Sequence, residues 1–264
     1  SELARSKVAV ALSGDGGDEL FGGYNRYFMA PSVWSLLSKF PYSFRNFGAD
    51  FFLSSPNLLK ALESTSRALY KKTPVQLVEK IQSLSSKVKN IKSEKDLFIS
   101  LISGHEDLSQ LLNFSGSPQS YVYDNEIWSN NHLSFQEKMM YLDMKTYLPD
   151  DIMCKVDRAS MAFSLETRAP FLHQNIVEES LKMPLEFKIK NKTGKYILRD
   201  ILYKHVPKEL IERPKQGFGV PLEEWIRGPL KETFYDSISE QNLGHNLINN
   251  NTVKKMLDDH ISGK

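Results

Sequence analysis

Three carboxylates stand within five positions of a glycine-rich turn near the start of the chain. Asp15, Asp18 and Glu19 surround Gly16 and Gly17. Carboxylate oxygens are ligands that Mg²⁺ prefers beside phosphates, and glycines let the backbone come close to a ligand. The same residues also fit a plain glycine turn whose Asp side chains cap a helix. The pattern therefore predicts either a site for phosphate and magnesium or a capped turn.

The elements around this turn favour a ligand site. Residues 7–12 form a short apolar run rich in Val and Ala that ends at glycines, which favours a buried strand over a helix. The acids that follow are typical of the first turn of a helix, where the helix dipole stabilises them. A strand followed by a glycine turn and a helix places these carboxylates at the carboxyl end of the strand, where open α/β sheets bind ligands. The turn matches neither a P-loop, an EF-hand nor a dinucleotide fingerprint.

The rest of the chain is predicted to be mainly helical. Apolar residues recur every three or four positions in segments 56–70, 73–85, 93–103, 134–147, 150–165, 173–182, 194–206 and 251–262. Ser134 and Glu137 have the spacing of a capping box, so a helix is expected to begin there. The polar stretches 84–95 and 239–252 predict a surface linker and a loop.

Composition excludes several classes of protein. The 264 residues contain 34 Lys and Arg against 32 Asp and Glu, and this near-neutral balance gives no reason to expect nucleic acid or an anionic membrane as a partner. Cys154 is the single cysteine, which leaves no intrachain disulfide and no cysteine-based zinc site. No apolar run of about 18 residues predicts a membrane span. We expect a cytoplasmic protein.

The complete string SGDGGDELFGGY, from Ser13 to Tyr24, is far more specific than its parts. It resembles the second signature of the glutamine-hydrolysing asparagine synthetase family, which lies in the synthetase domain. Further segments resemble the family in the same order, at 150–162, 166–172, 194–199 and 213–221. The resemblance implies an α/β parent fold with a parallel sheet, of the adenine nucleotide α-hydrolase type. This chain would supply a mainly α-helical part of it with one or few strands.

The resemblance also implies that residues 1–264 are the C-terminal portion of an asparagine synthetase-type synthetase domain. Family members carry an N-terminal glutaminase domain with a Cys nucleophile, and a Ser-Gly-Gly-x-Asp-Ser loop that grips the pyrophosphate of ATP. Neither occurs in this sequence. We therefore expect a piece of a longer chain that has little activity alone. Its strand at 7–12 would have open edges, so its stability would depend on a missing segment or on a homodimer.

The reaction implied by the resemblance is an AMP-forming amidation. ATP with Mg²⁺ activates the side-chain carboxylate of aspartate as an acyl-adenylate, and ammonia derived from glutamine then gives asparagine and AMP. ATP and a dicarboxylate are both anionic, so the site needs cations. Two alternatives stay open. One is a family member that amidates another carboxylate, such as a sugar acid or a β-lactam precursor, and the other is a non-catalytic binding or partner module.

Lys195 and Asp15 are the candidate catalytic residues by this resemblance. Lys195 matches the family lysine that contacts the phosphates and stabilises the charged transition state; the alternative is a solvated lysine at the start of a helix. Asp15 stands where many family members have the longer Glu, which leaves the placement of the amino-acid substrate open. The candidate residues for binding nucleotide and pyrophosphate, besides Lys195, are Ser13, Gly14, Gly16 and Asp18.

Four residues are candidates for binding the carboxylate substrate: Tyr147, Asp157, Arg158 and Glu166. Asp157 and Arg158 lie on the predicted helix 150–165, where an ordinary amphipathic helix with a surface ion pair is the alternative. For Glu166, the alternative to substrate binding is a buried structural ion pair with Arg168, and this alternative is slightly favoured. Tyr147 and Glu166 are also weighed as a Tyr–Glu pair, since such a pair works in this region of related ligases that make β-lactams.

Asp18 has a second predicted role besides nucleotide binding. It matches a family Asp near the nucleotide and magnesium, so it is the candidate Mg²⁺ ligand.

Overall fold

The chain folds into two compact units, which the computed structural model defines by their internal contacts. One unit contains residues 1–103 and 119–207, and the other contains residues 104–118 and 208–264. The structure describes residues 1–54, 88–103, 108–113, 120–212, 220–238 and 247–263. The predicted helices at 56–70 and 73–85 lie outside the described residues.

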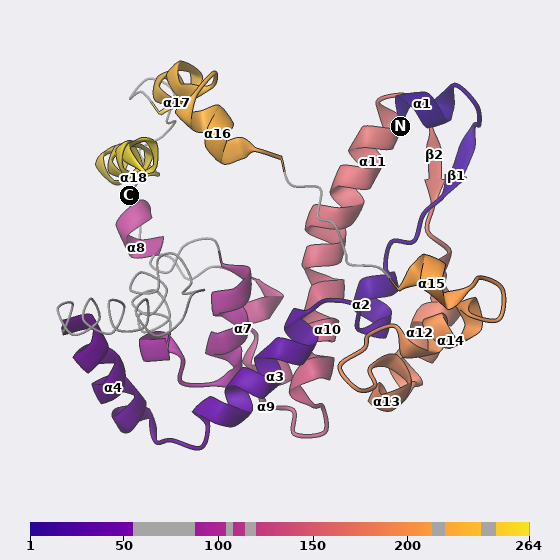
Figure 1. Ribbon diagram of the computed structural model, residues 1–264, viewed down its shortest axis with the longest axis horizontal. Helices are drawn as coiled ribbons and strands as arrows, with labels where there is room; N and C mark the ends of the chain where they lie inside the picture. The colour runs from indigo at the N-terminus through magenta and orange to yellow at the C-terminus, as the bar shows by residue number, and fades with distance from the viewer. Residues whose placement is uncertain (55–87, 104–107, 114–119, 213–219, 239–246, 264) are drawn as a thin grey trace. The chain divides into compact units, whose positions relative to one another are not determined.

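The first unit contains a small parallel sheet. β1 (Val10–Leu12) lies beside β2 (Glu166–Arg168), and the two strands pair in parallel register (Figure 1). The strand predicted at 7–12 is confirmed in a shorter form, because the helix α1 (Glu2–Arg5) and a turn precede it. The prediction that this strand is buried is wrong, since Val10 and Leu12 are 39% and 75% exposed. β2 was not predicted, since three residues without an apolar pattern carry no strand periodicity. A mainly helical chain with a parallel sheet is compatible with an α/β fold.

Both strands end at the glycine-rich turn. α2 (Gly17–Phe21) follows β1, and the 3-10 turn η3 (Pro170–Leu172) follows β2. The amide of Ser13 donates to the carbonyl of Arg168 at 2.8 Å, which continues the pairing of the strands past β1. The carboxyl ends of parallel strands lie at one edge of a sheet, so the segments that follow them are brought together.

Three consecutive helical segments form a column through the first unit (Figure 1). They are α10 (Phe135–Lys145), the π-helical turn η2 (Leu148–Met153) and α11 (Cys154–Met161). The sequence predicted one α-helix over 150–165. That prediction is wrong at its beginning, because η2 has the wider i to i+5 bonding of a π-helix. Residues of η2 and α11 that are three or four positions apart therefore do not lie on one face, as they would in a continuous α-helix.

The capping box that was predicted for α10 is confirmed. The hydroxyl of Ser134 accepts a hydrogen bond from the amide of Glu137, and the Glu137 carboxylate accepts one from the amide of Ser134 at 2.8 Å. Each bond satisfies an amide that the first turn of a helix leaves without an intrahelical partner.

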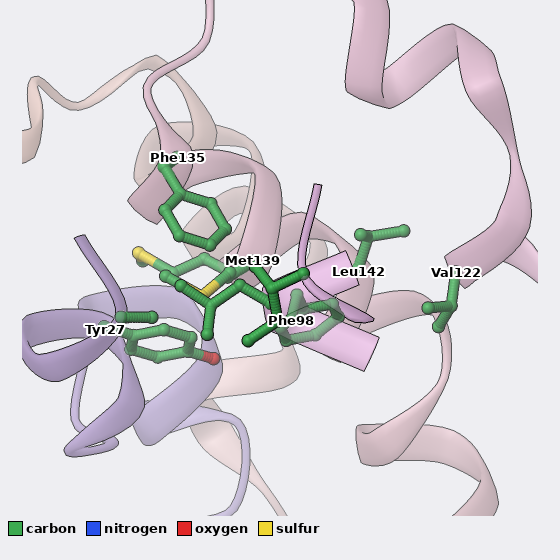
Figure 2. Packing of buried hydrophobic residues seen from close by; sticks show 10 residues of the cluster. Tyr27, Phe98, Val122, Phe135, Met139 and Leu142 are labelled. Atoms are coloured by element: carbon green, nitrogen blue, oxygen red, sulfur yellow. The ribbon is translucent and has the colours of Figure 1, made fainter. Parts of the chain in front are cut away.

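The core of the first unit lies where α3 (Arg26–Leu37), α7 (Glu94–Ile102) and α10 pack together. Figure 2 shows Met139 of α10 between the rings of this core, among them Tyr27 and Phe98. These three side chains are fully buried. Burial of each such side chain contributes roughly 1.5–3 kcal/mol, so this cluster fixes α3 against α10.

Among the remaining helices, those at Gln174–Lys182, Tyr196–Leu202 and Asn250–Ser262 confirm the predictions at 173–182, 194–206 and 251–262 with some shifts in length, and the others were not predicted. The first unit also contains α4 (Tyr42–Ser54), η1 (Tyr121–Tyr123), α9 (Asn125–Ser129), α12 (Gln174–Lys182), α13 (Leu185–Lys188) and α14 (Tyr196–Leu202). The second unit contains α8 (Leu108–Leu111), α15 (Lys208–Ile211), α16 (Leu222–Arg227), α17 (Lys231–Ser237) and α18 (Asn250–Ser262). In the part of the chain that the structure describes, no helix is long and apolar enough to cross a membrane.

Candidate active site

Lys195 and Asp18, far apart in the sequence, form an ion pair. Lys195 Nζ lies 3.0 Å from Asp18 Oδ2, and the two side chains are 29% and 30% exposed. The amide of Lys195 also donates to the carbonyl of Phe21 at 2.8 Å, at the last residue of α2. The glycine-rich turn and the later Gly-Lys segment, which the sequence predicted separately, therefore meet in one place that water can reach.

The backbone of Lys195 has an unusual conformation that helps to place its side chain. Its φ of +56° lies in the left-handed region, as do those of Asn191 and Lys192 in the preceding loop. The loop is closed by two backbone hydrogen bonds between Lys190 and Thr193. A residue other than glycine in this region costs about 1–3 kcal/mol, and the surrounding contacts have to maintain it. Lys195 is therefore held at the N-terminal end of α14 by its loop as well as by Asp18.

Two glycines make the approach of these segments possible. A Cβ on Gly23 would overlap the carboxylate of Asp18 and lie 2.5 Å from Lys195 Cε. A Cβ on Gly194 would overlap the carbonyl oxygen of Gly22. A side chain at either position would separate the loop from α2, so both glycines are required by the ion pair.

The segment after β2 packs against both ends of α2. The ring of Phe171 packs edge-on against that of Phe21, with centroids 5.9 Å apart. A Cβ on Gly16, which has a φ of +84°, would overlap Leu172. The family-like stretch 166–172 is thus in direct contact with the glycine-rich turn.

The outer part of the turn is more open. Gly14 is exposed, and a Cβ placed on it would meet nothing within 4 Å. Asp15 is half-buried, and the buried hydroxyl of Ser13 has no hydrogen-bond partner among the described residues. Open space is therefore shown at Gly14, next to a buried Ser13 hydroxyl that has no partner among the described residues.

A buried polar network lies directly behind the turn, and no pattern in the sequence indicated it. The hydroxyl of Tyr24 donates to Glu19 at 2.5 Å, and that of Tyr27 donates to Asp143 at 2.5 Å. Arg26 Nη2 lies 2.8 Å from Asp143 Oδ2. Glu19 and Asp143 are each 1% exposed. Only tertiary packing reveals the pairing of Asp143 with residues 116 and 117 positions away.

Burial dominates the electrostatics of this network. It raises the pKa of Glu19, although the hydrogen bond from Tyr24 acts in the opposite direction. Burial likewise raises the pKa of Asp143 against the opposing effects of Arg26 and Tyr27. For Arg26, burial is the largest single effect and lowers the pKa, but the charge and hydrogen bond of Asp143 and the nearby tyrosines together outweigh it, so the pKa is raised. The guanidinium therefore stays charged and holds Asp143.

Tyr147, one of the four candidates for substrate binding, belongs to the same network. The centre of the Arg26 guanidinium lies 4.5 Å from the ring centroid of Tyr24 and 5.1 Å from that of Tyr147. The two tyrosine rings are 5.7 Å apart. Such cation–π contacts contribute about 0.5–2 kcal/mol each. They connect the residue just before η2 to the segment that follows α2.

The other three candidates lie elsewhere in the first unit. Asp157 and Arg158 are exposed on α11, and no contact among the described residues joins them to Lys195. Glu166 pairs with Arg168 at 2.7 Å, but the two side chains are 55% and 65% exposed. The prediction of a buried pair is therefore wrong: the two residues are separated by two positions on β2, so they share its solvent-facing side. The contacts described for Tyr147 do not include Glu166.

Asp18, the predicted magnesium ligand, is not surrounded by further metal-binding side chains among the described residues. Asp18 offers one carboxylate, and the ammonium of Lys195 already contacts it. No group of three or more His, Cys, Asp or Glu side chains comes together as a metal site within the described ranges. Mg²⁺ commonly binds one or two carboxylates together with substrate phosphates, so Asp18 fits a metal that arrives with a nucleotide.

Comparison with known proteins places the chain in a family. The asparagine synthase family model matches residues 1–264. Asparagine synthetase [glutamine-hydrolyzing] 1 of Bacillus subtilis is 30% identical over 261 residues, which are 99% of this chain and 38% of that protein. Asparagine synthetase [glutamine-hydrolyzing] of Gallus gallus is 32% identical over 103 residues, 38% of this chain and 18% of that protein.

A relative with a different name is also similar. Amidase chry2 of Gibberella zeae is 29% identical over 110 residues, 39% of this chain and 16% of its own length. No solved structure matches. The chain spans less than two fifths of the length of these relatives. Because the family model covers every residue, the chain belongs to the asparagine synthase family.

Proposed function

We propose that this chain forms the part of an ATP-dependent synthetase site that converts aspartate to asparagine with ammonia derived from glutamine. The observation that carries the proposal is the Lys195–Asp18 ion pair, built at the carboxyl ends of two parallel strands in an asparagine synthase family member. A phosphate-binding site needs a cation that ligands can reach, and the partly exposed Lys195 provides one.

The proposed reaction has two steps. A carboxylate oxygen of aspartate attacks the α-phosphorus of ATP, and the bond to pyrophosphate breaks. Ammonia then attacks the carbonyl carbon of the acyl-adenylate, the bond to AMP breaks, and nitrogen loses a proton. Negative charge grows on the phosphate oxygens in the first step, and the ammonium of Lys195 is placed to stabilise it.

The neighbouring residues have supporting roles in this proposal. Asp18 orients the ammonium of Lys195 through the 3.0 Å ion pair. The backbone of Ser13, Gly14 and Gly16 would lie against the nucleotide and its pyrophosphate, with open space at Gly14. Asp15 offers a carboxylate to the amino group of the substrate or to the incoming ammonia.

Mg²⁺ enters the proposal only as a companion of ATP. When bound, it would neutralise charge on the phosphates, and Asp18 is the residue of this chain that would contact it. We further propose the adenine nucleotide α-hydrolase-like parent fold, a glutaminase domain as partner in the full-length protein, and a cytoplasmic location.

The proposal is tested by ATP–pyrophosphate exchange with aspartate in the full-length protein. Lys195→Met should reduce exchange by about 10²–10³-fold, which is typical for loss of a group that stabilises transition-state charge. Lys192→Met is the matched control: Lys192 is exposed, lies in the same loop and also has a positive φ, of +59°. Equal exchange rates in Lys195→Met and Lys192→Met would refute the role of Lys195.

A second measurement tests the domain proposal. We expect the isolated 264-residue chain to support little or no exchange, because the family's pyrophosphate-binding loop does not occur in it. Full exchange activity of the isolated chain would contradict this expectation.

Another carboxylate remains the alternative substrate. Asp15 is one methylene shorter than the Glu of many family members, and one similar protein is named an amidase. Exchange assays that replace aspartate with sugar acids or amino-acid-derived carboxylates distinguish the two. Exchange with one of these and none with aspartate would favour the alternative.

A further inference from the structure

Tyr24 links the chain that leaves α2 back to the helix itself. Its hydroxyl donates to Glu19 Oε1 at 2.5 Å, and Glu19 is the neighbour of Asp18 in α2. Two glycines, Gly22 and Gly23, lie between the two hydrogen-bonded residues. Glycine has more backbone freedom than any other residue, so a side-chain bond across both glycines restricts the path of the chain between them.

The backbone that this bond restricts lies beside the ion pair of the candidate active site. The amide of Gly23 donates to the carbonyl of Asp18 at 2.8 Å. A Cβ on Gly23 would overlap the Asp18 carboxylate and lie 2.5 Å from Lys195 Cε. A shift of the chain at Gly23 therefore changes the space that Asp18 and Lys195 share.

The ring of Tyr24 is held by three neighbours. The centre of the Arg26 guanidinium lies 4.5 Å from its centroid, and the rings of Tyr27 and Tyr147 are each 5.7 Å away. Arg26 is itself fixed by the buried carboxylate of Asp143, to which its Nε donates at 3.0 Å. The ring has little freedom to move, so its hydroxyl keeps a fixed position.

The hydroxyl of Tyr24 stays a donor at neutral pH. Burial raises its pKa, and the hydrogen bond to Glu19 and the charges of Glu19 and Asp18 raise it further. Glu19 is 1% exposed, and a buried acceptor that loses its donor is costly because water does not replace the bond. The bond between the two side chains is therefore maintained.

We propose that Tyr24 is a positioning residue for the ammonium of Lys195. Its bond to Glu19 holds Gly23 beside Asp18, which fixes where the ammonium stands. The inference rests on the proposed role of Lys195 and requires no contact between Tyr24 and a substrate. Loss of the bond lets the two glycines relax and displaces the ammonium, which weakens an interaction made in the transition state more than binding of the ground state.

The test is ATP–pyrophosphate exchange with aspartate by the full-length Tyr24→Phe protein, which keeps the ring and loses the hydroxyl. We expect kcat to fall about 10–100-fold, up to the loss that follows a 1 Å misplacement. KM for ATP should change little, because ground-state binding is retained. Glu19→Gln should keep most of kcat, since its amide oxygen still accepts the hydroxyl. Glu19→Leu has no acceptor and should lose as much as Tyr24→Phe.

Tyr27→Phe is the matched control. It removes one buried hydroxyl from the same network, but this hydroxyl donates to Asp143 and not to the neighbour of Asp18. The variant should lose stability to a similar extent and keep its kcat. Equal kcat values in Tyr24→Phe and Tyr27→Phe would overturn the proposal.

The Lys195→Met protein separates this inference from the proposed function. If Tyr24 acts through Lys195, Tyr24→Phe should cause no further loss of exchange in the Lys195→Met background. Equal fold losses in the two backgrounds would show independent action and overturn the inference. An unaltered rate in Lys195→Met by itself would instead refute the proposed role of Lys195.

A double variant keeps the proposal testable if Tyr24→Phe does not fold. Tyr24→Phe with Glu19→Leu replaces both polar partners by apolar side chains, a change that is often nearly neutral for stability. Its kcat should still be about 10–100-fold lower, since no directional bond spans the two glycines. A kcat equal to that of the unaltered protein would overturn the proposal.

Discussion

Replacing Gly194 with alanine should displace Lys195 and lower both stability and activity. Its backbone lies against the end of α2, and the next residue, Lys195, donates its amide to Phe21. An alanine Cβ at this position would lie 3.0 Å from both the carbonyl carbon of Gly22 and Cζ of Phe28, and would overlap the Gly22 carbonyl oxygen. A backbone carbonyl cannot rotate away as a flexible side chain can, so the loop itself has to move.

The size of the effect follows from these contacts. Forcing an additional carbon into a packed site costs about 1–3 kcal/mol. With roughly 2–4 °C per kcal/mol for a protein of about this size, Gly194→Ala should lower the melting temperature by about 2–12 °C. A shift of about 1 Å in a positioning group costs about 10²-fold in rate. We therefore expect ATP–pyrophosphate exchange by the full-length protein to fall about 100-fold through displacement of Lys195, while the melting temperature is compared in the 264-residue chain.

Gly48→Ala provides the matched control for this experiment. Gly48 lies inside α4, and a Cβ there would meet nothing within 4 Å. Alanine should stabilise that helix by about 0.5–1 kcal/mol relative to glycine, with exchange activity unchanged. Calorimetry and exchange assays on both variants provide the comparison. A Gly194→Ala protein with the unaltered melting temperature and exchange rate would refute the close approach of this loop to α2.

The buried network behind the turn gives three further predictions. Asp143→Ala should lower the free energy of unfolding by about 3–5 kcal/mol in urea denaturation, because it leaves the Arg26 charge unpaired; a loss as small as that of an exposed ion pair would contradict this. Tyr27→Phe should cost only about 1–3 kcal/mol in the same assay, since Arg26 still holds Asp143. Glu19→Gln should raise the melting temperature at pH 7. The pKa of Glu19 in the folded state is raised above the ordinary value of 4.5. Stability is therefore lost as the pH rises from 4.5 through the folded-state pKa, where the buried carboxyl has to ionise. The gain should shrink below pH 4.5, and a gain that is independent of pH would contradict the raised pKa.

The sequence by itself determined the local features of this protein. The apolar run at 7–12 and the glycines after it determine a strand and a turn, because their backbone preferences act between neighbours. Ser134 and Glu137 determine the start of α10 for the same reason. The string from Ser13 to Tyr24 also identified the family that the comparison found across the whole chain.

Tertiary structure alone decided which of these features meet. β2 is a strand because its three residues pair with β1, and their own pattern carries no such signal. The π turn of η2 changed the side-chain spacing that a uniform helix would have given. The contact of Lys195 with Asp18 depends on the space left by Gly23 and on a positive φ at a lysine. Contacts between residues more than one hundred positions apart depend on how whole elements pack, and local sequence preferences do not contain that information.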